Sequence, residues 1–456
     1  MKKITSLLLA ASFLASCQNT PAPSEESTTA NTITTKSEGK TTPAWAEHAS
    51  IYEVNIRQYT PEGTINAFSE HLDRLKELGI KVLWIMPVQP IGKENRKGGL
   101  GSYYSISDYT AVNPNFGTLE DFKALVNEAH ARDMKVILDW VANHTAFDHP
   151  WTKSHPEWYT HDSTGAIIPP VADWSDVADL NYDEKGLWAA MKESMQFWVK
   201  EADVDGFRCD VVMMVPMEFW NETRQALDSL KPVFMLAEAE GPEFHSAFDM
   251  TYGWEMHHIM NEIAKGEMDF SHFNNYLSKE DSLYAPEDLR MNFVTNHDEN
   301  SWNGTAYERM GANVHNYFVL CAGMKRSMPL VYSGQEAGLN KRLAFFEKDT
   351  INWSDESQYP FYQKVLALKA SHPALINGAE QGELEIIETD NPNVYAYGRS
   401  KGEKQVIFYM NFGDEAADIK LASDAGNLKN YMNGESMDAS KAHSLKGHDF
   451  LILVNN

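Results

Sequence analysis

The sequence is poor in cysteine and in basic residues, and it contains no apolar run long enough for a membrane span. Only 3 of its 456 residues are cysteine, and 39 Lys and Arg stand against 65 Asp and Glu, for a formal net charge of -26. Such an acidic surface repels nucleic acid, which excludes a nucleic-acid partner but leaves a neutral sugar polymer possible. A hydrophobic content of 43% supports a large packed core.

The N-terminal segment has the pattern of an export signal. Two lysines precede an apolar stretch at residues 4–14, which is too short for a stable membrane-spanning helix. The LASC sequence at residues 14–17 resembles a bacterial lipobox, with an ordinary signal peptide and a chance cysteine as the alternative. Gln18 follows Cys17, which resembles outer-membrane sorting in Gram-negative bacteria. We therefore predict a lipoprotein signal peptide over residues 1–17 and an outer-membrane anchor on Cys17, facing the periplasm or the cell surface.

The segment after the signal peptide and the remaining cysteines indicate no disulfide-stabilised structure. Residues 18–43 are rich in Ser, Thr, Pro, Ala and Glu, which predicts a flexible linker. If Cys17 is lipidated, only Cys209 and Cys321 remain, too few for a disulfide framework. Both lie in apolar predicted elements, so we expect buried free thiols.

Residues 51–373 alternate short apolar strands with amphipathic helices. The predicted strands are residues 51–55, 82–86, 136–140, 207–212, 234–239, 247–250, 291–295 and 330–332. The predicted helices include residues 65–78, 119–132, 187–202, 217–230, 313–325 and 361–371. Eight strands that alternate with helices predict an α/β fold, a (β/α)8 TIM barrel over residues 44–375, with a doubly wound sheet as the alternative.

Two segments depart from this alternation. Residues 145–182 follow the third strand and are long and irregular, which is typical of a functional loop; we predict a short inserted domain there. After residue 380 the pattern predicts strands at residues 383–388, 394–397, 405–411, 419–422 and 450–454. We interpret residues 380–456 as a C-terminal β-sandwich.

Polar side chains cluster where the apolar strands end. They are Asp139, Asn143 and His144 after the third strand, Arg208 and Asp210 on the fourth, Glu238 and Glu240 on the fifth, and His297 and Asp298 on the seventh. The carboxyl ends of barrel strands share one rim, so we expect these groups to converge there. We interpret Asp139 as a structural partner of the site rather than a catalyst.

The acids in this set suit glycoside cleavage. Arg208 and Asp210 point the same way on a strand, and the positive charge of Arg208 is expected to keep Asp210 ionised, as a nucleophile requires. Glu238 ends an apolar run, where desolvation raises a carboxyl pKa toward the range of a general acid. Two such carboxyl groups serve an oxocarbenium-like transition state, and Asp298 can stabilise its charge. A buried structural ion pair for Arg208 and Asp210, and Glu240 as the acid, are the alternatives.

These motifs, in this order, resemble the α-amylase family of glycoside hydrolases, also called glycoside hydrolase family 13. Asp179-Leu180-Asn181 and the segment GSYYSISDYTAVNPNFGT at residues 101–118 are similar to the family as well. The resemblance covers most of the chain from about residue 50. It implies a retaining hydrolase of α-1,4-glucosidic bonds in starch-like glucans or maltooligosaccharides.

The resemblance also implies catalytic roles. Asp210 matches the nucleophile, Glu238 the acid/base and Asp298 the transition-state stabiliser. Arg208 matches the residue that orients the nucleophile.

Further matches concern the substrate and a metal. His144 and His297 match the pair that hydrogen-bonds the sugar at the cleavage subsite, and Tyr104 matches the aromatic ring on which that sugar stacks. Asn143 and Asp179 match ligands of a structural calcium, whose preference for oxygen suits them. The alternatives are a satisfied loop histidine for His144 and an ordinary cap or turn pair for Asn143 and Asp179.

The sequence departs from the family at two places. Residues 211–214 read VVMM where many relatives carry a Lys-His pair on the leaving-group side, and Ala178 replaces a usual Pro. The bond specificity therefore stays open between an endo-acting α-glucan hydrolase and an exo-glucosidase, a cyclomaltodextrinase or a transglycosylase. A non-catalytic glucan-binding lipoprotein is the third possibility, and it ranks last because all three acids are present.

Overall fold

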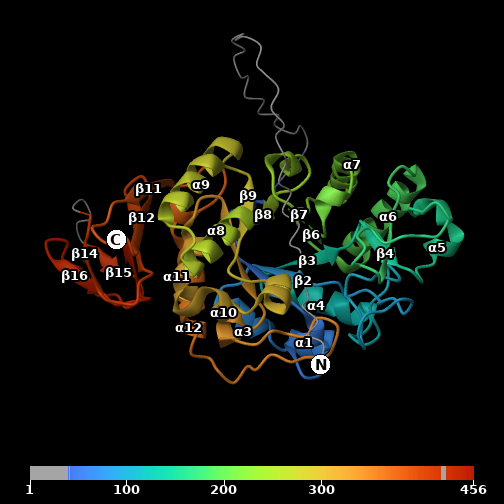
Figure 1. Ribbon diagram of the computed structural model, residues 1–456, viewed down its shortest axis with the longest axis horizontal. Helices are drawn as coiled ribbons and strands as arrows, with labels where there is room; N and C mark the ends of the chain where they lie inside the picture. The colour runs from blue at the N-terminus through green and yellow to red at the C-terminus, as the bar shows by residue number, and fades with distance from the viewer. Residues whose placement is uncertain (1–39, 41, 423–427, 456) are drawn as a thin grey trace, which may run out of the picture. The chain divides into compact units, whose positions relative to one another are not determined.

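A closed barrel of eight parallel strands forms the centre of the protein (Figure 1). The computed structural model describes residue 40, residues 42–422 and residues 428–455. The barrel order is β1-β10-β9-β8-β7-β6-β3-β2. These strands are β1 Ile51–Val54, β2 Val82–Ile85, β3 Lys135–Trp140, β6 Gly206–Cys209, β7 Phe234–Ala237, β8 Met250–Tyr252, β9 Leu289–Asn292 and β10 Ser327–Tyr332. The predicted (β/α)8 barrel is confirmed.

The strands alternate between two apolar environments, as a period of two requires. In β2, Val82 and Trp84 belong to the cluster that fills the barrel. Leu83 and Ile85 belong instead to the larger cluster between the strands and the helices. Both faces of every barrel strand are therefore buried, which explains the near-continuous apolar runs in the sequence.

Helices follow most of the barrel strands. They are α1 Ile56–Tyr59, α2 Ile65–Ser69, α3 Leu72–Leu78, α4 Leu119–Ala131, α6 Lys185–Ala202, α7 Met217–Asp228, α8 Trp254–Lys265, α9 Phe270–Leu283, α10 Ala306–Met310, α11 Val314–Gly323 and α12 Tyr359–Ser371. The single helix predicted at residues 65–78 is two helices, α2 and α3. They separate at His71, whose ring packs on Tyr59 and Trp353, contacts that depend on the tertiary fold.

The sixth barrel strand lies later than predicted. Residues 247–250 were expected, but Ala247 and Phe248 donate their backbone N–H groups to the carbonyl of Phe244 and end the short helix Pro242–Ser246. The strand β8 therefore begins only at Met250.

The long loop after β3 is less irregular than expected. Its ends, β4 His144–Ala146 and β5 Val177–Asp179, pair as antiparallel strands, and α5 Trp151–Ser154 lies between them. This pairing holds the loop closed at the rim of the barrel.

The C-terminal region consists of antiparallel sheets, consistent with the predicted β-sandwich. The strands are β11 Glu383–Ile387, β12 Val394–Lys401, β13 Lys404–Asn411, β14 Ala417–Lys420, β15 Lys429–Asn430, β16 Ala442–Leu445 and β17 Phe450–Val454. The sheets order as β11-β12-β13-β17-β15 and β14-β16 and enclose their own apolar cluster. β15 and β16 were not predicted. Figure 1 shows these strands beside α11 and α12, and the Asn316 amide donates to the carbonyl of Asn411 at 2.9 Å.

The structure describes two of the cysteines and can be searched for membrane-spanning helices. Cys209 and Cys321 are buried and free, as predicted. Within the part of the chain that the structure describes, no helix is both long and apolar enough to cross a membrane. Cys17, with the predicted signal peptide and most of the linker, lies outside the described residues.

Candidate active site

One buried arginine joins three carboxylates at the carboxyl end of the barrel. The side chain of Arg208, on β6, is fully buried, and its Nη1 lies 2.9 Å from Oδ1 of Asp139 and 2.9 Å from Oδ1 of Asp210. Its Nη2 lies 2.9 Å from Oε1 of Glu238, an ion pair without the alignment of a hydrogen bond. The structure therefore brings together Asp210 and Glu238, which follow neighbouring strands.

Three aromatic side chains hydrogen-bond to Arg208 and Asp139 and hold them in place. Nε of Arg208 donates to the hydroxyl of Tyr252 at 3.1 Å. Trp84 donates its indole N–H to Asp139 at 3.0 Å, and the hydroxyl of Tyr104 donates to the same carboxylate oxygen at 3.1 Å. Asp139 thus accepts hydrogen bonds from three side chains, which fits the structural part predicted for it.

The residue after Asp210 has an unusual backbone. Val211 adopts a left-handed conformation, with φ of 37° and ψ of 51°. A β-branched residue is rarely found there, and the strain costs about 1–3 kcal/mol. In this conformation its N–H donates to Oε2 of Glu238 at 2.8 Å. The local strain thus serves to orient Glu238.

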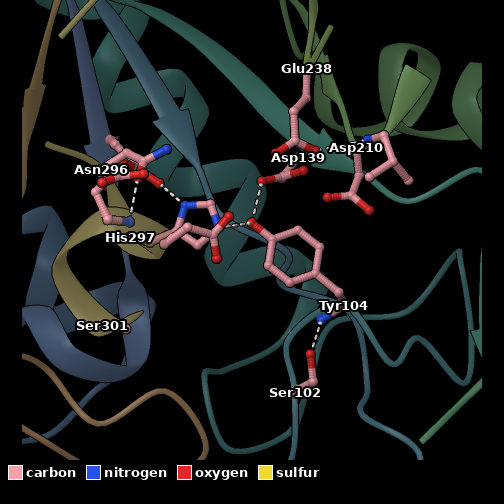
Figure 2. A network of polar contacts seen from close by, with 12 residues as sticks. Ser102, Tyr104, Asp139, Asp210, Glu238, Asn296, His297 and Ser301 are labelled. Atoms are coloured by element: carbon pink, nitrogen blue, oxygen red, sulfur yellow. Dashed lines mark hydrogen bonds and ion pairs between the residues drawn. The ribbon is translucent and has the colours of Figure 1, made fainter. Parts of the chain in front are cut away.

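A second network reaches the site from the opposite strands of the barrel (Figure 2). Nε2 of His297 lies 2.9 Å from the hydroxyl of Tyr104 and 3.3 Å from Oδ2 of Asp298. Nδ1 of His297 bonds to the buried carboxylate of Glu53 on β1. Figure 2 shows Glu238, Asp139 and Asp210 converging beside the ring of Tyr104.

Burial dominates the titration of the two central acids. It raises the pKa of Asp210 to about 6 and that of Glu238 to about 7, while Arg208 opposes both shifts. Arg208 favours the ionised form of Asp210, as expected, but desolvation outweighs this attraction and the net shift of the pKa is upward. The order still has the predicted sign, with Glu238 the weaker acid.

The two histidines titrate in opposite directions. Burial lowers the pKa of His144 to about 3, and the backbone of Tyr104 hydrogen-bonds to it. Burial also opposes the charge on His297, but Asp298 and Glu53 overcome it and raise the pKa of His297 to about 9. At neutral pH the site therefore contains one neutral and one cationic imidazole.

Glu240, the alternative acid, belongs to a different network. Its carboxylate pairs with the buried Arg290 and accepts the backbone N–H of Glu255 at 3.0 Å. Arg290 also contacts Glu280 at 3.2 Å. Glu240 is thus engaged away from Arg208.

The residues predicted to hold calcium lie next to each other. The N–H of Leu180 donates to the carbonyl of Asn143 at 3.1 Å, and Asp179 is paired with His144 across β4 and β5. Burial raises the pKa of Asp179, and no Lys, Arg or His in the described ranges pairs with it. Among the described residues, no group of three or more His, Cys, Asp or Glu side chains could hold a metal. The two oxygen donors fit a hard cation only if carbonyls and water complete its shell.

Sequence reasoning missed Glu53, Trp84 and Tyr252. The signal for Glu53 was a charged residue within the apolar strand β1, at an inward-facing position. Its partner His297 is distant in sequence, so only closure of the barrel reveals the pair. Trp84 and Tyr252 read as ordinary core residues, and their polar atoms became visible only in the structure.

Comparison with known proteins identifies the family. The family model "Alpha amylase, catalytic domain" matches residues 24–165 and 171–364. An α-amylase structure from Lactobacillus plantarum is 30% identical with a TM-score of 0.82, covering 90% of this chain and all of that one. The maltogenic α-amylase AmyB from Thermotoga neapolitana is 31% identical with a TM-score of 0.80, covering 90% of this chain and 99% of that one. The chain belongs to the α-amylase family, and it is an enzyme of the α-amylase type.

The chain matches little more than half the length of one curated relative. The α-amylase MalA of Haloarcula japonica is 28% identical over 403 residues, which cover 83% of this chain. The match spans 57% of the length of that relative.

Proposed function

We propose that this protein hydrolyses α-1,4-glucosidic bonds of starch-like glucans or maltooligosaccharides with retention of configuration. Asp210 is the nucleophile, Glu238 the acid/base and Asp298 the stabiliser of the transition state. The observation that carries the proposal is the pairing of Asp210 and Glu238 with one buried guanidinium, that of Arg208.

The reaction takes two displacements. In the first, an oxygen of Asp210 attacks the anomeric carbon while Glu238 gives its proton to the departing glycosidic oxygen, leaving a glycosyl ester on Asp210. In the second, Glu238 takes a proton from water, and the water oxygen displaces Asp210 from the anomeric carbon. Arg208 positions both carboxyl groups throughout.

The pKa order supports these roles. An acid with a pKa of about 7 is about half protonated at neutral pH and can donate its proton, whereas a group at about 6 is mostly ionised there. The neighbouring carboxylates raise the pKa of Glu238 further once Asp210 and Asp298 are charged.

The substrate contacts are proposed on similar grounds. Tyr104 presents a ring whose hydroxyl is fixed by Asp139 and His297, which suits it to stack on the sugar at the cleavage subsite. His297 hydrogen-bonds to the hydroxyl of Tyr104 and His144 to its backbone, and both histidines are proposed to bond the hydroxyl groups of that sugar.

A second candidate activity concerns the leaving-group side. Met213 and Met214 are 55% and 40% exposed next to Asp210, where many relatives carry polar residues. An apolar surface there favours a second sugar over water as the acceptor, which would make the enzyme a transglycosylase. Exo-glucosidase and cyclomaltodextrinase action use the same acids and differ only in the outer loops.

Chromatography of the products from starch, maltoheptaose, cyclodextrin and pullulan separates these activities. Mixed oligosaccharides from starch are expected for the endo-acting hydrolase, and Asp210→Asn is the matched inactive control. Glucose alone, preferred cleavage of cyclodextrin, or products longer than the substrate would each replace the endo-acting hydrolase with the corresponding alternative.

We also propose a structural calcium between Asn143 and Asp179. When bound, it would link the start of the long loop to its end. The support is the half-buried Asp179, which lacks an ion-pair partner among the described residues.

The location is proposed from the N-terminal sequence. A lipid on Cys17 would attach the enzyme to the outer membrane of a Gram-negative bacterium, and residues 18–43 would hold it away from the bilayer. Neither Cys17 nor its neighbours are among the described residues.

A further inference from the structure

An exposed tryptophan follows directly on the candidate site. Trp302 lies in the short π-helix Glu299–Asn303, which begins immediately after Asp298. It is 51% exposed, although residues 293–297 before Asp298 are buried. A π-helix is rare and frequently marks a functional site.

Trp302 extends a row of aromatic rings that begins at the cleavage subsite. The ring of Phe345 lies 6.3 Å from that of Tyr104, nearly parallel at 11°, and 6.4 Å from that of His297. The ring of Trp302 lies 5.3 Å from Phe345 at 43°. Phe346 supports Trp302 from another side at 5.8 Å. The aromatic surface is therefore continuous from Tyr104 to Trp302.

The backbone around Trp302 is fixed by side-chain hydrogen bonds. The hydroxyl of Ser301 donates to the carbonyl of Leu343 at 2.9 Å. The amide of Asn300 donates to the carbonyl of Lys341 at 3.0 Å and accepts the N–H of Leu343 at 2.8 Å. The ring is thus presented on an ordered support, which reduces the entropy lost when a ligand binds.

The position of the acid indicates which part of the substrate reaches Trp302. Glu238 protonates the glycosidic oxygen, so the leaving group, which carries the reducing end, must lie beside Glu238. Arg208 contacts Glu238 and lies over the ring of Tyr104, and Phe345 separates Tyr104 from Trp302. Trp302 therefore lies beyond the cleavage subsite from Glu238, which is the side of the non-reducing end.

We propose that Trp302 stacks on a glucose residue of the substrate on the non-reducing side of the cleavage subsite. This inference rests on the proposed function and adds a binding position to it. The flat apolar face of a pyranose matches an indole ring, and the support from Phe345 and Phe346 keeps that ring in place.

The test measures cleavage bond by bond. Maltooligosaccharides from maltotriose to maltoheptaose, labelled at the reducing end, give a kcat/KM for each bond in wild type and in Trp302→Ala. For bonds with two or more glucose units on the non-reducing side, we expect a loss of about tenfold. Bonds with a single glucose unit there should be unchanged. Trp302→Phe should recover most of the loss.

Controls separate this inference from the proposed function. Leu283→Ala removes another exposed apolar residue, on α9, and should leave the kcat/KM of every bond unchanged. Three outcomes would overturn the inference while the proposed function stands. They are an equal loss of kcat/KM at all bonds, no loss, or a loss that depends on the number of glucose units on the reducing side. In the Asp210→Asn background, calorimetry with maltoheptaose should show weaker binding after Trp302→Ala, and unchanged binding would overturn the inference. If the wild type cleaves no α-glucan, the proposed function fails.

Discussion

Replacing the proposed acid should stabilise the protein while it abolishes efficient catalysis. Glu238→Gln removes a carboxyl group that ionises in a buried environment. The side-chain amide oxygen of the substituted Gln can still accept the hydrogen bond from the N–H of Val211. Because the folded-state pKa is raised, ionisation costs more in the folded than in the unfolded state. The cost is absent below the unfolded pKa, grows as pH rises from about 4.5 to about 7, and is constant above.

The magnitude follows from the shift. The pKa of Glu238 rises from 4.5 to about 7, and one pKa unit corresponds to about 1.4 kcal/mol, so the full penalty is about 3 kcal/mol. Asp210 and Glu238 titrate as a coupled pair, so part of this penalty belongs to both groups. We expect Glu238→Gln to raise the free energy of unfolding by roughly 1–3 kcal/mol at pH 8.

Urea denaturation at pH 4.5 and pH 8 measures this difference. The gain should be large at pH 8 and should shrink at pH 4.5, where the wild-type carboxyl is largely protonated in the folded state. Glu193→Gln, on the exposed face of α6, is the control and should show no gain at either pH. A variant that is less stable than wild type at pH 8, or one with the same gain at both pH values, would refute the reasoning.

Three further predictions address the site, the metal and the anchor. The kcat/KM of the wild type should follow a narrow bell, rising as Asp210 ionises near about 6 and falling as Glu238 ionises near about 7; a flat profile between pH 5 and pH 8 would contradict these assignments. If calcium binds Asn143 and Asp179, a chelator should lower the melting temperature and excess calcium should restore it, whereas a midpoint indifferent to both leaves the pair metal-free. Cells fed a labelled fatty acid should label the wild-type protein but not Cys17→Ser, and equal labelling of both would rule out the anchor.

The barrel was predictable because its signals are local. Apolar runs with turn residues between them predicted seven of the eight strands in place and the sixth too early, and the period of two placed Arg208 and Asp210 on the same side. The helices α8 and α9 were not among those named from the pattern, and the helix at residues 65–78 was predicted unbroken. Its break depends on contacts of His71 with Tyr59 and Trp353, which no local pattern contains.

The arrangement of the site was only partly predictable, because much of it is made by contacts distant in sequence. Polar residues at strand ends predicted which side chains converge. The bond from Glu53 to His297 forms only when the barrel closes and brings β1 near the end of β9. The left-handed conformation of Val211 is likewise set by its surroundings. The pKa of Asp210 depends on how far burial outweighs Arg208, a balance that requires the packed structure.

The stereochemistry of the first product tests the central claim that Asp210 forms a covalent glycosyl intermediate. The two carboxyl groups of a retaining glycosidase lie about 5–5.5 Å apart, without room for a water between them. Proton NMR of maltoheptaose hydrolysis, recorded before mutarotation, should show the α-anomer first. Early β-anomer would mean inversion, and the nucleophile role of Asp210 would then have to be withdrawn.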